Sequence, residues 1–166
     1  MKKNKRKKIK IISPQEIVDT AEIVSGITPE AAQKYREQLL QSQPFLMEFF
    51  EKVESDNLPH EKLLNDLLLT VYLAVASSTR AHIPEIQFQT IDQTLEKYTG
   101  AIKRVSSLGA SEEAHRADVE ILLAADSQPQ LFSYVLERLD EFACAEEGMI
   151  RCFFRIAVEV LGRRCV

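Results

Sequence analysis

The sequence predicts an all-α protein, and three observations support this fold class. Each of the six prolines stands where the sequence pattern predicts that a new helix begins. Between the prolines, apolar residues recur every three or four positions, which is the spacing of one helix face. The chain lacks sustained alternation of apolar and polar residues, and it has no Asn-Gly or Asp-Gly hairpin turn. A chain of 166 residues is long enough for one self-sufficient core, so we expect a single bundle of about seven to eight helices.

The first four predicted helices begin at Pro14, Pro29, Pro44 and Pro59. Ser13, Pro14 and Glu16 form the pattern of a capping box, and Gly26 is expected to end this helix in the left-handed conformation. The second helix is expected to run to about residue 41, and the third to present Phe45, Phe49 and Val53 on one face. The fourth helix, 59–78, is apolar nearly all round at its centre, which is typical of a buried helix.

Four further helices are predicted in the second half of the chain. The fifth is expected to begin at Ile83-Pro84 and to run to 106, although Gly100 weakens its carboxyl end. Ser111 is expected to cap the sixth helix and Ser127-Gln128-Pro129 to begin the seventh. The eighth is predicted over 146–163.

The tripeptide Ser-Gln-Pro occurs twice, at 42–44 and at 127–129, which are 85 residues apart. Each copy is preceded by a helix rich in Glu and Ala and followed by an acidic stretch and a strongly apolar helix. This order predicts two three-helix units at 28–79 and 111–163, with the two apolar helices packed near the centre of the bundle. Chance similarity between amphipathic helices is the alternative interpretation.

The first twelve residues are predicted to be a disordered basic arm, and 13–166 a single helical domain. The arm carries seven positive charges and no acid, whereas residues 11–166 hold 14 basic and 25 acidic residues. Clustered lysines neutralise phosphates, so a polyanion is one candidate partner for the arm. An acidic protein or an anionic membrane surface is another, and a solubilising leader without a partner is the third. The candidate polyanion-binding residues are Lys2, Lys3, Lys5, Arg6, Lys7, Lys8 and Lys10.

Three cysteines, Cys144, Cys152 and Cys165, lie near the carboxyl end. Their odd number and the absence of a CxxC pair argue against a disulfide framework and against a zinc site. We therefore expect buried or terminal free thiols and a reducing, cytoplasmic environment. No run of apolar residues reaches the length of a membrane span or of a signal peptide, so a soluble protein that is not exported is expected.

A metal site has one weak candidate. Glu112 and His115 have the Glu-x-x-His spacing that places two ligands on one helix face. A di-metal centre needs a second copy of this pair and two further glutamates, and the sequence offers no second copy. We therefore expect no cofactor. Motifs for nucleophilic catalysis and phosphate-binding glycine loops are also absent, so the sequence gives no support to an enzyme.

The last predicted helix places Arg151, Arg155 and Glu159 every four residues on an otherwise apolar cylinder. One interpretation is a solvated charged stripe on a mostly buried helix. The other is an interface with a second subunit, formed by Arg151, Phe153, Phe154 and Arg155, because arginine among aromatic residues is typical of interface centres.

The sequence thus favours a non-catalytic helical protein-interaction module, which acts with another protein or as a homodimer. Its basic arm would add attachment to an acidic partner or weak, non-specific binding of nucleic acid. The alternative is a small helical protein that binds a metal or another ligand. A component of a larger assembly, without activity of its own, is a third hypothesis.

Overall fold

The computed structural model describes residues 8–79, 82–106, 127–141, 147–163 and 165 of the chain. In these residues every regular element is helical, which confirms the predicted all-α fold class. The predicted sixth helix and Cys144 lie outside the described residues. The α-helices are α1 (Pro14–Ser25), α2 (Pro29–Ser42), α3 (Pro44–Ser55), α4 (Glu61–Ser78), α5 (Phe88–Ser106), α7 (Pro129–Glu141) and α8 (Glu147–Gly162).

Local hydrogen bonds explain where the first helices begin and end. The Ser13 hydroxyl accepts from the backbone N–H of Glu16 at 3.2 Å, and the Glu16 carboxylate accepts from the backbone N–H of Ser13 at 2.8 Å. This is the predicted capping box. Thr28 caps α2 by accepting from the backbone N–H of Ala31 at 3.2 Å. The expected left-handed Gly26 is wrong, because its φ of −93° is right-handed and its N–H donates to the last carbonyls of α1.

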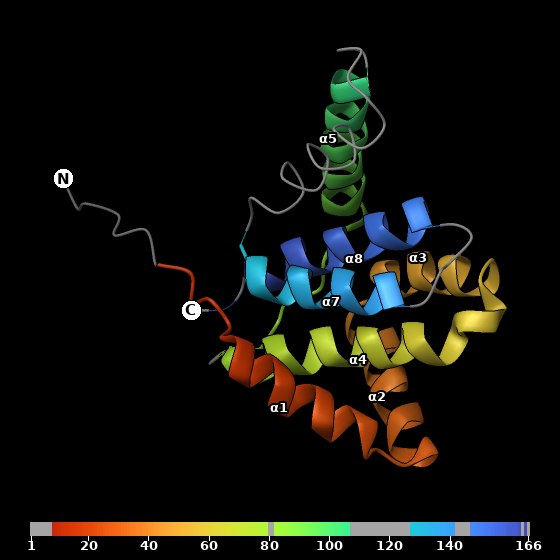
Figure 1. Ribbon diagram of the computed structural model, residues 1–166, viewed down its shortest axis with the longest axis vertical. Coiled ribbons are helices and arrows are strands. Elements are labelled where there is room, and N and C mark those ends of the chain that lie inside the picture. The colour runs from red at the N-terminus through yellow and green to blue at the C-terminus, as the bar shows by residue number, and fades with distance from the viewer. Residues whose placement is uncertain (1–7, 80–81, 107–126, 142–146, 164, 166) are drawn as a thin grey trace.

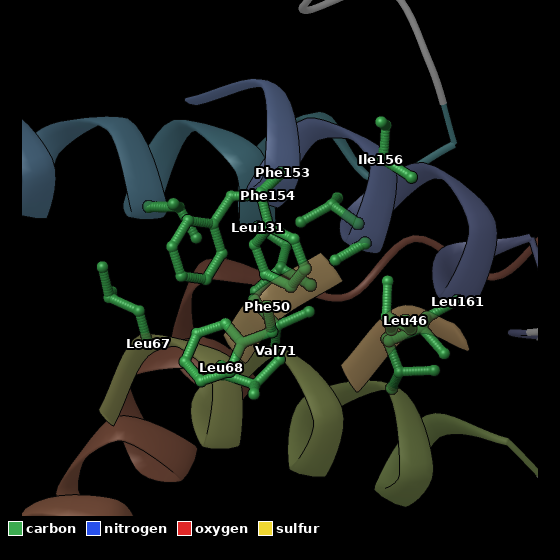
Figure 2. Close-up of a cluster of buried hydrophobic side chains, with 14 of the residues drawn as sticks. Leu46, Phe50, Leu67, Leu68, Val71, Leu131, Phe153, Phe154, Ile156 and Leu161 are labelled. Carbon is green, nitrogen blue, oxygen red and sulfur yellow. The ribbon is translucent and has the colours of Figure 1, made fainter. Parts of the chain in front are cut away.

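The two strongly apolar helices, α4 and α8, pack against each other at the centre of the bundle (Figure 1). α1, α2 and α3 pack against α4, while α3, α5 and α7 pack against α8. Aromatic and branched aliphatic side chains fill the space between these helices (Figure 2), among them Phe50, Leu68, Val71, Leu131, Phe153 and Phe154. None of the described helices has both the length and the apolarity that crossing a membrane requires.

Two helices begin later than predicted. α4 starts at Glu61 because Leu58–His60 forms a short 3-10 turn first. α5 starts at Phe88 rather than at Pro84, because the preceding residues are non-helical and are bonded to the side chain of Gln43, which lies between α2 and α3. The carbonyl of Pro84 accepts from the Gln43 amide at 3.0 Å, and the N–H of Ile86 donates to the same amide at 2.9 Å.

At its carboxyl end, the predicted basic arm is bonded to the helical body of the protein. Ile12 is fully buried, and the backbone N–H of Lys10 donates to the carbonyl of Cys165 at 3.0 Å. The side chain of Gln128 bonds both Lys10 and Ile12. The structure describes the arm from Lys8 onward, and these bonds join its residues 10–12 to the helical body.

Candidate functional site

Two hollows on the described surface are large enough to take part of a partner molecule. The polar hollow, of about 390 Å³, lies between the α1–α2 turn and α4 and includes Arg36, Lys62, Asn65 and Asp66. The apolar groove, of about 290 Å³, lies between α3, α5 and the start of α8. Its apolar lining consists of Phe45, Phe49, Phe88, Ile91, Leu95 and Met149.

Charged groups in the polar hollow are already engaged with one another. Arg36 donates from Nη1 and Nη2 to the two carboxylate oxygens of Glu54, at 2.9 and 2.7 Å, and from Nη1 to Asn65 at 2.7 Å. The hydrogen bonds that Arg36 donates to Glu54 raise the pKa of Arg36 above its usual value, and Lys62 pairs with Asp66 at 2.9 Å. These bonds join α2, α3 and α4, so the polar hollow is a structural network rather than a free anion site.

Two side chains of the apolar groove, by contrast, have much of their surface open to solvent. Phe88 is 59% exposed and Met149 is 46% exposed, whereas residues of this type are usually buried. The rings of Phe45 and Phe88 meet edge to face with centroids 6.3 Å apart, which joins α3 to the start of α5. Phe49 lies 5.3 Å from Phe153 and so connects the groove with the core. Glu48, Lys52 and Asp92 provide its charged residues.

The residues predicted to form a subunit interface on the last helix lie in the core of this chain. Phe153, Phe154 and Arg155 are fully buried, and Arg151 is mostly covered and paired with Asp140. In this structure these four side chains are thus covered mainly by other parts of the same chain. The only member of α8 in the apolar groove is Met149, at its exposed first turn.

The other interpretation of this helix, a solvated charged stripe, is wrong, because Arg155 and Glu159 are both buried. The Arg155 guanidinium lies 5.0 Å from the centre of the Phe132 ring and 3.9 Å from the Glu159 carboxylate. Arg163 donates to the same carboxylate from Nε at 2.8 Å. α8 therefore carries an ionic group into the interior next to α7, where a charge needs such partners to offset its lost hydration.

The candidate polyanion residues divide into two groups. Lys2, Lys3, Lys5, Arg6 and Lys7 lie outside the described residues, whereas Lys8 is exposed. Lys10 is part of the domain, and its Nζ pairs with Glu16 at 2.8 Å. The salt bridge and the N–H of Ser13 lower the pKa of Glu16 to about 2. Lys10 thus has a role in fixing the start of α1.

Metal and thiol chemistry find little support in the described part of the chain. No three His, Cys, Asp or Glu side chains in it lie close enough to hold a metal ion, and the weak candidates Glu112 and His115 are outside it. Cys165 is buried and Cys152 is half-buried, and burial raises the pKa of both thiols. Neither thiol is therefore an activated nucleophile.

The sequence did not predict two features of the structure, the phenylalanine lining of the apolar groove and the hydrogen bonds of two buried glutamines. Phe45 and Phe49 were expected to share a face with Val53, but Val53 is buried while both phenylalanines line the apolar groove. The sequence shows Gln43 and Gln128 as parts of a repeated tripeptide, and in the structure both are fully buried and bonded to non-helical backbone. The repetition itself was the available signal for the glutamines.

No protein-family model, curated protein or solved structure matches this chain. Its functional interpretation therefore depends on the geometry of its own residues. Among the features described, the apolar groove is the one that combines a concave shape with large apolar side chains in contact with solvent.

Proposed function

We propose that the protein is a helical interaction module and that the apolar groove binds an amphipathic helix of a partner protein. The observation that carries the proposal is the exposure of Phe88 and Met149 at the mouth of a groove that Phe45 and Phe49 also line. Exposed apolar surface gathered in one concave place favours a binding site, whereas single exposed apolar residues do not.

The spacing of the lining residues supports a helix as the occupant. Phe45 and Phe49 are four residues apart on α3, and Phe88, Ile91 and Leu95 follow helical spacing on α5. The groove is thus bordered by side-chain rows of two helices. A third helix fits such a groove by inserting residues at positions i, i+3, i+4 and i+7.

Charge favours a basic partner. Residues 11–166 carry 25 acidic and 14 basic residues, and the groove itself has two acids, Glu48 and Asp92, against one lysine, Lys52. An acidic surface around an apolar groove attracts a cationic amphipathic helix and repels an anionic one. We therefore assign the partner segment a leucine-rich face and a lysine- or arginine-rich face.

A labelled synthetic helix of about five turns, with leucines on one face and lysines on the other, tests the proposal by fluorescence anisotropy. We expect a Kd in the micromolar range that rises at least about tenfold in the Phe88→Ser variant, because interface aromatic residues carry much of the binding energy. The same helix with glutamates in place of the lysines should bind more weakly. NMR shift changes should be confined to residues of α3, α5 and α8.

Leu58→Ser is the matched control, because Leu58 is 63% exposed but does not line the apolar groove. It should leave the Kd unchanged. Equal binding by the Phe88→Ser and Leu58→Ser variants would contradict the groove as the site. Self-association of the full chain that Phe88→Ser abolishes would instead make a second copy the occupant, and would overturn the assignment of a basic partner helix.

The basic arm supports a second candidate function, attachment to a polyanion. Seven basic residues fall within the first ten, and only Lys10 of the described ones is paired within the domain. If the other six contact duplex phosphates, the slope of log K against log salt should be about −5. Deleting residues 1–8 should abolish this slope, and an unchanged slope would exclude the arm.

A further inference from the structure

Two buried glutamines hold two extended segments in the same way. The Gln43 amide donates to the carbonyl of Pro84 at 3.0 Å and accepts from the N–H of Ile86 at 2.9 Å. The Gln128 amide donates to the carbonyl of Lys10 at 2.7 Å and accepts from the N–H of Ile12 at 2.9 Å. We call each of these arrangements a glutamine clamp. In each, one side chain pairs with a carbonyl and with the N–H two residues later.

Both clamps are buried, and each pins an isoleucine into the core. Gln43, Gln128 and Ile12 are fully covered, and Ile86 is 4% exposed. A buried backbone N–H or carbonyl must be paired, and these extended residues have no strand beside them among the described residues. The glutamine amide, with its donors and its acceptor, takes the place of that strand.

The elements around the clamps also correspond. Each pinned segment leads into a helix, α1 or α5, and each glutamine precedes another helix, α3 or α7. Thr20 and Thr94, ten residues after Lys10 and Pro84, are both buried and both donate to the carbonyl four residues earlier at 2.7 Å. Helix periodicity alone does not require these matching hydrogen bonds.

The packing of α1 and α5 follows the same correspondence. We define the first half as residues 10–79 and the second half as residues 84–163. α1 packs on α4 of its own half and on α7 of the other, while α5 packs on α8 of its own half and on α3 of the other. α4 and α8 meet at the centre (Figure 1). If the two halves are exchanged, α1 takes the place of α5, and the packing contacts of these two helices are reproduced.

We propose that the chain is a pseudo-dimer of two related halves that exchange their leading segments, 10–12 and 84–86. The glutamine of the first half holds the leading segment of the second half, and the glutamine of the second half holds that of the first. The interface between the halves is therefore equivalent to one between two copies of a single unit. The halves extend beyond the 28–79 and 111–163 units that the tripeptides predict, because they include the leading segments and the helices that follow them.

The full chain with a protease site inserted at positions 80–81 provides the test, since these positions lie between the halves. After the folded protein is cleaved, we expect the two fragments to co-elute as one species. The urea midpoint of the cleaved protein should rise with protein concentration, because its folded state is bimolecular. Gln43→Leu and Gln128→Leu should each increase the dissociation constant of the fragments by about 10–100-fold, because each leaves buried backbone groups unpaired.

Thr20→Val is the matched control, because Thr20 is buried and its hydroxyl bonds only within its own helix. It should change the dissociation constant by less than about threefold. If either leucine variant fails to fold, Gln43→Asn and Gln128→Asn replace it, since asparagine keeps the amide but is one methylene shorter. Fragments that separate with both glutamines intact would overturn the proposal. So would a clamp substitution that leaves their dissociation constant unchanged.

Discussion

The two central helices occupy comparable places in the bundle but differ in what they bury. α4 buries only uncharged residues, including Leu64, Leu68, Val71 and Val75. α8 is equally well covered, yet it buries Arg155 and Glu159. In the register set by the two Ser-Gln-Pro tripeptides, these positions correspond to Thr70 and Ala74 of α4.

Comparing the two helices shows what packing contributes to holding a central helix and what a buried ion pair adds to it. Packing without a buried charge is sufficient to hold a central helix in this bundle, since every residue that α4 buries is uncharged. The ion pair of α8 is therefore an addition rather than a requirement of the architecture. A buried pair adds little net stability, but the loss of one partner is costly because the other charge stays buried.

The largest effect is expected for Glu159→Leu, which removes the carboxylate beside both Arg155 and Arg163. Loss of this carboxylate should lower the free energy of unfolding by about 3 kcal/mol, because the Arg155 guanidinium stays fully buried. Urea denaturation measures the change. The double variant Arg155→Met with Glu159→Leu should recover most of the loss.

Thr70→Val removes a polar group from α4, at the position that corresponds to Arg155. Thr70 is buried, and its hydroxyl donates to the carbonyl of Asp66 at 2.8 Å. Valine has nearly the same shape, so the free energy of unfolding should fall by about 1 kcal/mol or less. Equal losses for Thr70→Val and Glu159→Leu would show that charge does not distinguish the two helices.

For Gly162→Ala, at the end of α8, we expect an effect smaller than that of Glu159→Leu. A Cβ atom there would lie 2.4 Å from Cγ of Gln128, whose amide also donates to the carbonyl of Gly162 at 3.2 Å. The side chain of Gln128 must then shift, which should cost about 1–3 kcal/mol of stability and loosen the second clamp. Calorimetry at fixed protein concentration would measure the change.

Gly100→Ala is the control for this variant, because a Cβ atom at Gly100 has no neighbour within 4 Å. In α5 this substitution should stabilise the protein by about 0.5–1 kcal/mol. If both alanine variants shift the Tm in the same direction, the close approach of Gly162 to Gln128 does not require a glycine at position 162.

The smallest effect is a pH dependence at the start of α1, which α5 lacks because its first turn has no acid. The salt bridge with Lys10 and the N–H of Ser13 lower the pKa of Glu16 from 4.5 to about 2 in the folded protein. Glu16 therefore stabilises the fold when the pH is above 4.5, the pKa of the unfolded chain. This stabilisation is lost as the pH falls through the folded-state pKa of about 2. Both side chains are partly exposed, so solvent screening keeps the effect small.

Comparing the urea midpoints of the wild type and of Glu16→Gln between pH about 5 and about 2 isolates this contribution. The wild type should lose more stability over the interval than the variant does. Parallel curves would mean that the salt bridge does not contribute to folding.

The sequence predicted most helices because their start signals are local. Proline, a capping hydroxyl and helical spacing act within a few residues, as at Ser13–Glu16. The sequence did not predict that Phe88 and Met149 would border one groove, because that depends on how α3, α5 and α8 pack. It likewise did not predict the burial of Arg155, which α7 provides through Phe132. These features depend on packing between helices that are far apart in the sequence, and helical periodicity carries no information about that packing.

Amide hydrogen exchange at Ile12 and Ile86 tests the correspondence of the two halves most directly, because each amide donates to one glutamine clamp. In the wild type both amides should be strongly protected. Gln128→Leu should release Ile12 and leave Ile86 protected, while Gln43→Leu should do the reverse. Exchange of either amide at the rate of an open chain in the wild type would contradict the paired clamps.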